Sequence, residues 1–424
     1  MEEQNPWWSG NKDYTYEEWN NYRIKWIPEA INQINFEPFS LNFIFGPRQV
    51  GKTTAIKICI HDLLKKMDPK SIFYYSCDEL IDYKELGEVL DNYISAREQW
   101  KIKKSVIFLD EITFVEDWWR VVKYKIDQGI FKNDVLVITG SASIELMKQR
   151  EYFPGRRGKG RDIRFLPMCF SEYVRKFGNI EIKTSSINDI EEVRKVMKTN
   201  QIYSEKINKL FLQYLKTGGF PIPIKDFYEF GTVSVNSKKI YLDWLRNDWN
   251  KIGKNDKFMK EVISYILKTR LSPISWLGIS KETSMNSPHT VQSYIESLEE
   301  LFVLKVLDLI SPDSKVLYKK NKKIHVTDPF LYHVFSYYTN QKIMEETIVE
   351  SVLASHLSRI SETFFWRNAS EVDVISLIND EQVGFEVKWG FRSWRKPKHI
   401  KNYFLLTKEN LAIFLASVDW NEIY

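Results

Sequence analysis

Apolar runs and amphipathic segments alternate along the first 140 residues of the chain. Four apolar runs predict buried strands, at 41–45, 71–76, 105–110 and 134–143, and three segments with helical periodicity predict helices, at 53–66, 83–99 and 117–127. Strands that are apolar throughout suit a sheet that is covered on both faces. The pattern therefore predicts an α/β domain built on a parallel sheet.

A glycine loop joins the first predicted strand to the first helix. Residues 46–53 read Gly-Pro-Arg-Gln-Val-Gly-Lys-Thr and fit the pattern G-x-x-x-x-G-K-[ST]. In that geometry backbone N–H groups and the helix N-terminus face a polyphosphate, Lys52 reaches the β- and γ-phosphates, and the Thr53 hydroxyl holds Mg²⁺. ATP and Mg²⁺ are the expected ligands, and an ordinary glycine-rich turn is the alternative. The residues expected to bind the nucleotide are Gly46, Pro47, Arg48, Gln49, Val50, Gly51, Lys52, Thr53 and Thr54.

Two carboxylates end the apolar run at 105–111. Acidic residues are common at strand ends, but this pair follows the glycine loop and precedes a predicted helix. We therefore expect Asp110 to bind Mg²⁺ through its water shell and Glu111 to orient the attacking water.

Two further polar features follow the predicted strand 134–143. Ser141 is the preferred contact to the γ-phosphate or the water, ahead of Thr139 and Ser143, and a simple Gly-Ser turn is the alternative. Arg156 lies in a glycine-rich basic loop and could stabilise transition-state charge, in its own subunit or in a neighbour. A solvated loop, or a contact to a nucleic-acid backbone, remains an equal alternative for Arg156.

The motifs occur in a characteristic order: GPRQVGKTT at 46–54, FLDEI at 108–112 before Trp118, ITGSAS at 138–143, PGRRG at 154–158, and then 164–173 and 217–221. This order resembles the prokaryotic AAA-type ATPases, abundant in archaea, that carry an uncharacterised C-terminal domain. The resemblance covers nearly the whole chain and implies an α/β ATPase core. The sequence departs from the AAA pattern because it has no clear second-sensor arginine.

The middle of the chain predicts a winged helix-turn-helix. Helices are expected at 258–269, 274–279 and 287–300, and strands at 302–309 and 315–327. A DNA-reading version would place His289, Thr290, Gln292 and Ser293 in the major groove and Lys319, Lys320, Lys322 and Lys323 on phosphates. The third helix ends in three glutamates, Glu296, Glu299 and Glu300, whose negative charge is unfavourable near phosphates. A lid or a protein-docking module is therefore an equal alternative to a DNA-reading domain.

The tail resembles the PD-(D/E)xK arrangement of restriction-endonuclease-like folds. Asp373 and Glu386 are expected on adjacent strands, where they would share Mg²⁺ or Mn²⁺, and Glu350 on the preceding helix is an additional candidate ligand. Lys388 would support the nucleophile or the transition state. Val372 replaces the usual proline before the aspartate. The sequence therefore leaves two alternatives, an active nuclease and a fold that has lost its catalytic activity. The segment 388–401 adds six Lys or Arg residues interleaved with aromatics, which suits nucleic acid but also a solvated loop.

Composition excludes several classes of protein but does not indicate a function. Hydrophobic residues make up 43% of the chain, which excludes global disorder, and the net charge of +5 permits a nucleic-acid partner without requiring one. The cysteines Cys59, Cys77 and Cys169 lie far apart without a C-x-x-C pair, which argues against disulfides and zinc. A cytoplasmic protein without a membrane partner is expected, because no apolar run reaches 18 residues and the N-terminus lacks a signal peptide.

The expected organisation is an N-terminal arm (1–40), a P-loop core (41–180), a helical lid or linker (181–257), a winged helix (258–328) and a nuclease-like domain (329–424). The tryptophans of the arm favour packing against the core over stacking on adenine. The first hypothesis is a Mg²⁺-dependent ATPase coupled to a DNA-binding, nuclease-like half in DNA processing. The alternative is a nucleotide-gated switch that recruits protein partners and keeps an inactive nuclease-like scaffold. Homo-oligomerisation stays open.

Overall fold

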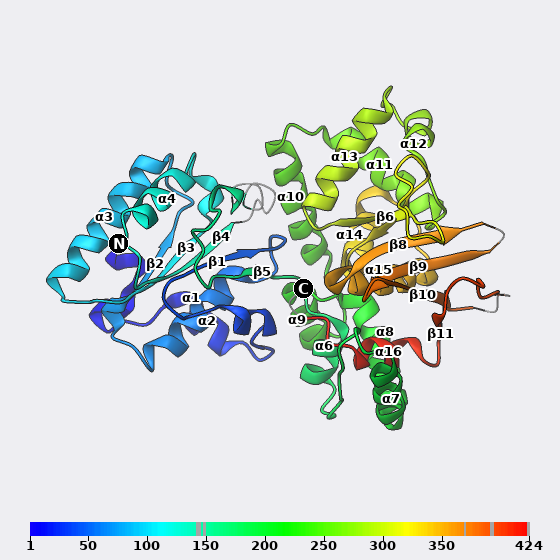
Figure 1. Cartoon of the computed structure of the whole chain (residues 1–424), viewed down its shortest axis with the longest axis horizontal. Coiled ribbons are helices and arrows are strands. Elements are labelled where there is room, and N and C mark those ends of the chain that lie inside the picture. The colour runs from blue at the N-terminus through cyan, green and yellow to red at the C-terminus, as the bar shows by residue number, and fades with distance from the viewer. Residues whose placement is uncertain (141–145, 147–149, 369, 391–393, 422–424) are drawn as a thin grey trace. The chain divides into compact units, whose positions relative to one another are not determined.

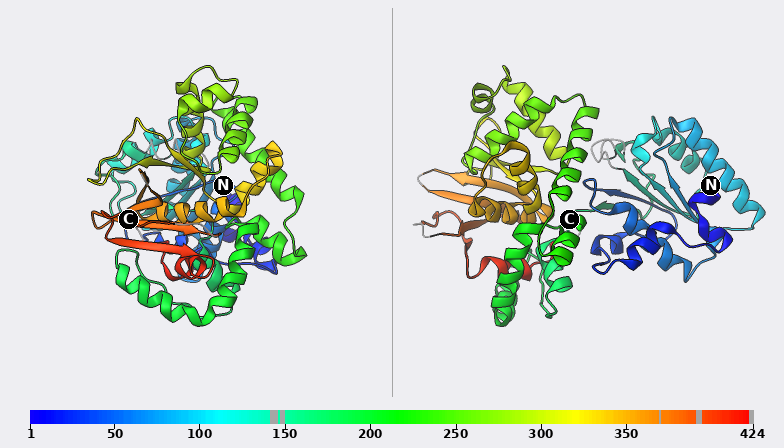
Figure 2. Two further views of the ribbon diagram at one scale, coloured as in Figure 1. Left: turned by 90° about the vertical axis from the view of Figure 1, so that its right-hand side faces the viewer. Right: turned by 180° about the vertical axis from the view of Figure 1, so that it is seen from behind.

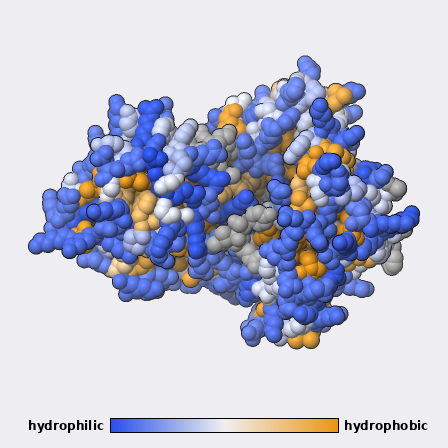
Figure 3. Space-filling model, in the orientation of Figure 1, coloured by the Kyte–Doolittle hydropathy of each residue, from blue (hydrophilic) through white to orange (hydrophobic). Residues whose placement is uncertain are grey.

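The computed structural model describes residues 1–140, 146, 150–368, 370–390 and 394–421. The chain divides into two compact units, Met1–Leu166 and Pro167–Tyr424 (Figure 1). On the face drawn in Figure 3, both units present mainly hydrophilic residues, with apolar residues in scattered groups. Throughout the described ranges, each helix is too short or too polar to cross a bilayer.

The N-terminal unit is built on a five-stranded sheet in the order β2-β3-β4-β1-β5, with all neighbours parallel. Its strands are β1 (Ser40–Phe45), β2 (Ile72–Ser76), β3 (Val106–Asp110), β4 (Val135–Gly140) and β5 (Asp162–Arg164). Its helices are α1 (Tyr14–Asn21), α2 (Lys52–Leu64), α3 (Tyr83–Gln99) and α4 (Trp119–Asp127). Helices α1 and α2 cover one face and α3 and α4 the other (Figures 1 and 2), which confirms the predicted α/β sheet. Parallel strands bring their carboxyl ends to one edge, where the candidate site lies.

The N-terminal arm packs against strand β2. Trp7 and Trp8 donate their Nε1 hydrogens to the carbonyl of Ile72, over 3.1 and 3.0 Å. Asn5 exchanges two hydrogen bonds with the backbone of Tyr74, of 2.9 and 2.7 Å. These contacts confirm the packing interpretation for Trp7 and Trp8.

A buried ion pair ties α3 to the opposite edge of this sheet. Arg97 Nη1 lies 2.6 Å from Asp134 Oδ2, and the backbone N–H of Ser105 donates to Asp134 Oδ1 over 2.8 Å. Burial raises the pKa of Asp134, and Arg97 opposes that shift. The pair therefore anchors the starts of β3 and β4, whose far ends carry the candidate catalytic residues.

The C-terminal unit is built on a six-stranded sheet in the order β11-β10-β9-β8-β6-β7. Its strands are β6 (Leu304–Leu309), β7 (Lys323–Val326), β8 (Glu362–Arg367), β9 (Glu371–Ile378), β10 (Glu381–Lys388) and β11 (Asn402–Thr407). Strands β8, β9 and β10 form an antiparallel meander, and β11 adds to β10 in parallel. The antiparallel pair β6–β7, which the sequence placed in a wing, joins the same sheet because β6 pairs in parallel with β8.

Helices surround this sheet. They are α6 (Phe170–Phe177), α7 (Ile190–Asn200), α8 (Ser204–Thr217), α9 (Pro221–Phe230), α10 (Val235–Lys251), α11 (Asp256–Thr269), α12 (Trp276–Glu282), α13 (Pro288–Glu300), α14 (Pro329–Thr339), α15 (Glu345–Ile360) and α16 (Leu411–Ser417). Helices α11, α12 and α13 contact one another and precede the β6–β7 pair, in the order predicted for a winged helix. Helix α15 packs across β6, β7, β8 and β9 (Figure 1), which brings its side chains to the centre of the sheet.

Asp328 begins helix α14 and also holds a distant turn. Its carboxylate accepts from the N–H groups of Phe330 and Gly219, both over 2.8 Å. Gly218 has a φ of 58°, and a Cβ there would lie 1.8 Å from Asp328 Oδ1, so only glycine fits. Burial raises the pKa of Asp328 to about 6, although the hydrogen bonds from the two backbone N–H groups oppose this shift.

Candidate functional site

The glycine loop connects β1 to α2 as the sequence predicts. Gln49 and Gly51 adopt left-handed conformations, with φ of 58° and 95°, which turn the chain tightly before helix α2 begins at Lys52. Gly46 lies against the backbone of Phe165, where an added Cβ would come within 1.9 Å of the carbonyl oxygen. The loop is therefore held in place by strand packing at its first glycine.

Lys52 folds over the loop. Its Nζ donates to the carbonyl oxygens of Gly46 and Pro47, both over 2.9 Å, and the residue is buried. The ammonium is thus positioned beside the N-terminus of α2, where two positive features would act on the same anion.

Asp110, at the end of β3, is the centre of a buried hydrogen-bond network. Its Oδ2 accepts from Thr53 Oγ1 over 2.7 Å and from the Tyr74 hydroxyl over 3.0 Å, and its Oδ1 accepts from Thr139. Glu111 follows in a left-handed conformation, with a φ of 55°, and its N–H donates to Thr139 Oγ1 over 3.2 Å. The structure therefore brings Thr53, Asp110 and Glu111 together, as expected.

Tyr74 is the member of this network that sequence reasoning missed. Burial, and then the charge of Asp110, raises the pKa of its phenol well above the ordinary range, so it stays a hydrogen-bond donor. No local motif marks Tyr74. Only the parallel register of β2 and β3, in which Tyr74 pairs with Phe108 and Ser76 with Asp110, brings it to the carboxylate.

The other predicted residues of this unit have different outcomes. Ser141 and Ser143 lie outside the described residues, whereas Thr139 lies within them and contacts Asp110. Arg156 forms an ion pair with Asp127 at the end of α4, with 2.6 Å between Nε and Oδ1. Its role toward a phosphate stays a prediction.

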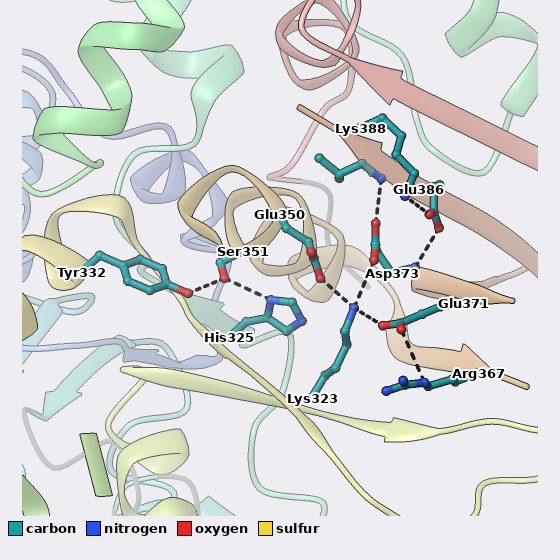
Figure 4. Close-up of polar contacts among 11 residues, drawn as sticks. Lys323, His325, Tyr332, Glu350, Ser351, Arg367, Glu371, Asp373, Glu386 and Lys388 are labelled. Atoms are coloured by element: carbon teal, nitrogen blue, oxygen red, sulfur yellow. Dashed lines mark hydrogen bonds and ion pairs between the residues drawn. The ribbon is translucent and has the colours of Figure 1, made fainter. Parts of the chain in front are cut away.

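A second cluster of charged side chains lies in the C-terminal unit, around the predicted PD-(D/E)xK residues (Figure 4). Asp373 comes from β9 and Glu386 from β10, and both are buried. Asp373 Oδ2 accepts from the N–H of Val387 over 2.9 Å, Glu386 Oε2 accepts from the N–H of Asp373 over 3.3 Å, and Lys388 pairs with Glu386 Oε1. The aspartate, the glutamate and the lysine are therefore adjacent, as expected.

Lys323 on β7 occupies the middle of this cluster. Its Nζ lies 2.8 Å from Glu350 Oε1, 2.8 Å from Glu371 Oε1 and 3.1 Å from Asp373 Oδ1. Burial alone would lower the pKa of Lys323, but Glu350, Asp373 and Glu371 hold it well above the ordinary value. The ammonium is therefore charged inside the sheet.

The carboxyl groups of the cluster share this electrostatic environment. Burial and the charge of Asp373 raise the pKa of Glu350 to about 8, although Lys323 opposes the shift. The same two causes raise the pKa of Glu386 to about 7, opposed by Lys388. Carboxylates that are crowded together in a largely buried site resist ionising together.

The lysines of the expected wing require a correction. Lys322 and Lys323 are buried, Lys322 in an ion pair with Asp308 and Lys323 in the carboxylate cluster, so neither is exposed for a phosphate. The expectation follows from their place in the predicted ribbon, whereas lysine can be buried when it is paired with a carboxylate. Lys319 and Lys320 remain exposed.

The predicted metal ligands Glu350, Asp373 and Glu386 have ammonium partners, and their binding of a metal stays a prediction. Within the part of the chain that the structure describes, no group of three or more His, Cys, Asp or Glu side chains is arranged to hold a metal ion. Glu350 and Asp373 face Lys323 instead, and Glu386 faces Lys388. The cluster thus pairs its carboxylates with ammonium groups of the protein.

Two family models match parts of the chain. Residues 39–174 match the family described as an AAA domain, and residues 208–342 match a domain of unknown function, DUF8612. The chain is 28% identical to the uncharacterised protein MJ1637 of Methanocaldococcus jannaschii over 44% of this chain and 39% of that protein. It is 22% identical to the uncharacterised ATP-binding protein MJ1076 of the same organism, over 69% of this chain and 83% of that protein.

Among solved structures, the Walker-type ATPase paby2304 of Pyrococcus abyssi is similar with a TM-score of 0.42 and 12% identity, covering 79% of this chain and 95% of that one. The family match, the strand order and the geometry of the glycine loop agree on the N-terminal unit. The N-terminal unit therefore has an α/β P-loop fold with a parallel sheet, residues 39–174 match an AAA domain, and the similar proteins include ones described as ATP-binding.

Proposed function

We propose that this chain binds and hydrolyses ATP with Mg²⁺ and uses the nucleotide to control a DNA-binding, nuclease-like C-terminal half. The observation that supports the ATPase most directly is the 2.7 Å hydrogen bond between Thr53 and Asp110. It joins the start of α2 to the end of β3, so the two groups expected to hold Mg²⁺ already face each other beside the loop.

Each residue of the network has a separate proposed task. Lys52 leaves the loop carbonyls and pairs with the β- and γ-phosphates, while Thr53 and Asp110 hold Mg²⁺, Asp110 through its water shell. Magnesium, when bound, neutralises phosphate charge. Glu111 orients the attacking water and receives its proton, and Thr139 holds the backbone N–H of Glu111 in place.

Ser141 and Arg156 complete the proposal. Ser141, which lies outside the described residues, is proposed to contact the γ-phosphate or the water. Arg156 stabilises the charge of the transition state, which requires it to exchange Asp127 for a phosphate in its own subunit or a neighbouring one.

Two substitutions test the ATPase. Lys52→Ala should abolish nucleotide binding and phosphate release, whereas Glu111→Gln should bind ATP and turn it over about 10² to 10⁴ times more slowly. Lys66→Ala is the matched control, because this exposed lysine lies just beyond α2. Phosphate release by Lys52→Ala at the wild-type rate would overturn the ATPase proposal. Wild-type turnover in Glu111→Gln would show that another residue activates the attacking water.

DNA binding is proposed from the positive side chains of the C-terminal unit. Lys319 and Lys320 are exposed, as are His289 and Ser293 on helix α13. Because phosphate contacts release counterions, affinity measured by gel shift should fall steeply between two salt concentrations, and the Lys319→Ala, Lys320→Ala double variant should reduce that salt dependence. Equal affinity at both concentrations would contradict phosphate contacts.

A second candidate function is a nucleotide-gated switch that recruits a protein partner. The ammonium of Lys323 inside the carboxylate cluster favours it, because a paired cluster suits a scaffold better than a reactive centre. If the chain does not bind single-stranded, duplex or branched DNA at low salt, the result would favour the nucleotide-gated switch over the DNA-binding function.

A further inference from the structure

We propose that Lys323 is a built-in cation that takes the place of the metal ion in the nuclease-like site. The cluster of Glu350, Glu371 and Asp373 then holds no divalent metal and does not cleave phosphodiester bonds. The inference is independent of ATP hydrolysis, because the cluster lies wholly within the C-terminal unit.

The geometry of the cluster fits an ammonium. Lys323 Nζ has three hydrogens, and three carboxylate oxygens lie 2.8, 2.8 and 3.1 Å away. Glu350 comes from α15, while Glu371 and Asp373 alternate along β9 and therefore share a face of the strand. Figure 4 shows the three carboxyl groups converging on the lysine, which donates hydrogen bonds to Glu350 and Asp373 and forms an ion pair with Glu371.

Carboxylate oxygens of Asp373 and Glu386 have further partners in the protein. Asp373 Oδ2 accepts from the N–H of Val387, and the two oxygens of Glu386 face Lys388 and the N–H of Asp373. A magnesium ion requires oxygen ligands at about 2.0–2.1 Å in octahedral geometry. An ion that used the oxygens facing Lys323 would lie within about 5 Å of the ammonium, where the two positive charges repel each other.

The strand that carries Lys323 is fixed against helix α15. Lys323 pairs with Leu307 of β6 in the sheet, and only 2% of the residue is exposed. Two residues on, His325 contacts Ser351 over 3.1 Å, and Ser351 is bonded to the Tyr332 hydroxyl over 2.6 Å (Figure 4). Because β7 is anchored beside the cluster at both residues, the ammonium belongs to the folded core and does not act as a mobile surface group.

Binding of Mn²⁺ to the full chain, followed by electron paramagnetic resonance, tests the proposal. Wild type and Asp373→Asn should bind the same number of Mn²⁺ ions, because the wild-type cluster takes none. Lys323→Met should bind one ion more, and adding Asp373→Asn to it should remove that ion. Lys322→Met is the matched control, since it removes a neighbouring buried lysine that pairs outside the cluster, with Asp308.

Three outcomes would overturn the proposal. One is a wild-type Mn²⁺ site that Asp373→Asn removes, and another is a folded Lys323→Met chain that gains no ion. The third is cleavage of DNA in Mg²⁺ or Mn²⁺ by wild type that is lost in Asp373→Ala and Glu386→Ala. If Lys323→Met does not fold, the wild-type comparison with Asp373→Asn decides alone. ATP turnover measured in the same samples should be unchanged, which separates this result from the ATPase proposal.

Discussion

Replacing Arg97 by methionine should destabilise the N-terminal unit while sparing its glycine loop. Asp134 is 1% exposed, and Arg97 supplies its counter-charge at 2.6 Å. Methionine keeps an unbranched apolar chain but leaves the carboxylate buried without a cation. Removing one partner of a buried ion pair costs about 3–5 kcal/mol.

Hydrogen exchange read by mass spectrometry measures this loss within the unit. Peptides that cover β3 and β4 should exchange roughly a hundredfold to several thousandfold faster in the variant, since each 1.4 kcal/mol is about a factor of ten. Arg120→Met is the matched control. That arginine pairs with Asp117 at the surface, over 2.9 Å, and exposed pairs contribute only about 0–1 kcal/mol.

Two further observations check the cause. Asp134→Asn added to Arg97→Met should restore part of the stability, because the amide oxygen still accepts from the Ser105 N–H while the unpaired charge is gone. Burial raises the pKa of Asp134 in the folded chain, and protonation would remove the unpaired charge, so without Arg97 the loss of stability should be smaller at pH 5 than at pH 8. Exchange within threefold of wild type, or an equal loss at both pH values, would refute the reasoning.

Three other changes have expected outcomes. Gly46→Ala should leave the unit folded but weaken ATP binding by at least tenfold in a titration, because a Cβ at 1.9 Å from the Phe165 carbonyl displaces the loop; unchanged affinity would contradict this. Thr139→Val should slow ATP turnover with little effect on ATP binding, because it removes the acceptor for the Glu111 N–H, and wild-type turnover would exclude that positioning role. Burial raises the pKa of Asp328 from 3.8 to about 6, so the folded chain holds this proton more tightly and stability is lost as pH rises from about 4 to 6. Urea unfolding should show wild type losing about 3 kcal/mol relative to Asp328→Asn over that range, and parallel pH curves would show that Asp328 does not titrate there.

The N-terminal site could be predicted because its information is local. The glycine loop, Lys52 and Thr53 lie in one short motif, and Asp110 and Glu111 end a recognisable strand. Tyr74 escaped prediction because its contact depends on which strands are neighbours. Apolar periodicity specifies an element, whereas strand order depends on the packing of the whole sheet.

The C-terminal unit shows the same limit more strongly. The β6–β7 pair was located, but its parallel partner β8 lies more than fifty residues along the chain from β6. Lys323 is predicted as a wing lysine from its place in the ribbon, and its carboxylate partners in the cluster all come later in the sequence. The strand Lys-Ile-His-Val directly follows a polar, lysine-rich stretch, so no local signal marks Lys323 as buried.

The pairing of β6 with β8 has a consequence for how a ribosome delivers this chain. When β7 emerges, the neighbour strand of β6 and all three carboxylates that surround Lys323 are still to be translated. The hairpin therefore waits with an apolar face and an unneutralised ammonium until Glu371 and Asp373 have been made. A nascent chain stopped after residue 342, where the DUF8612 match ends, would be a substrate for chaperones or proteases rather than a smaller folded protein.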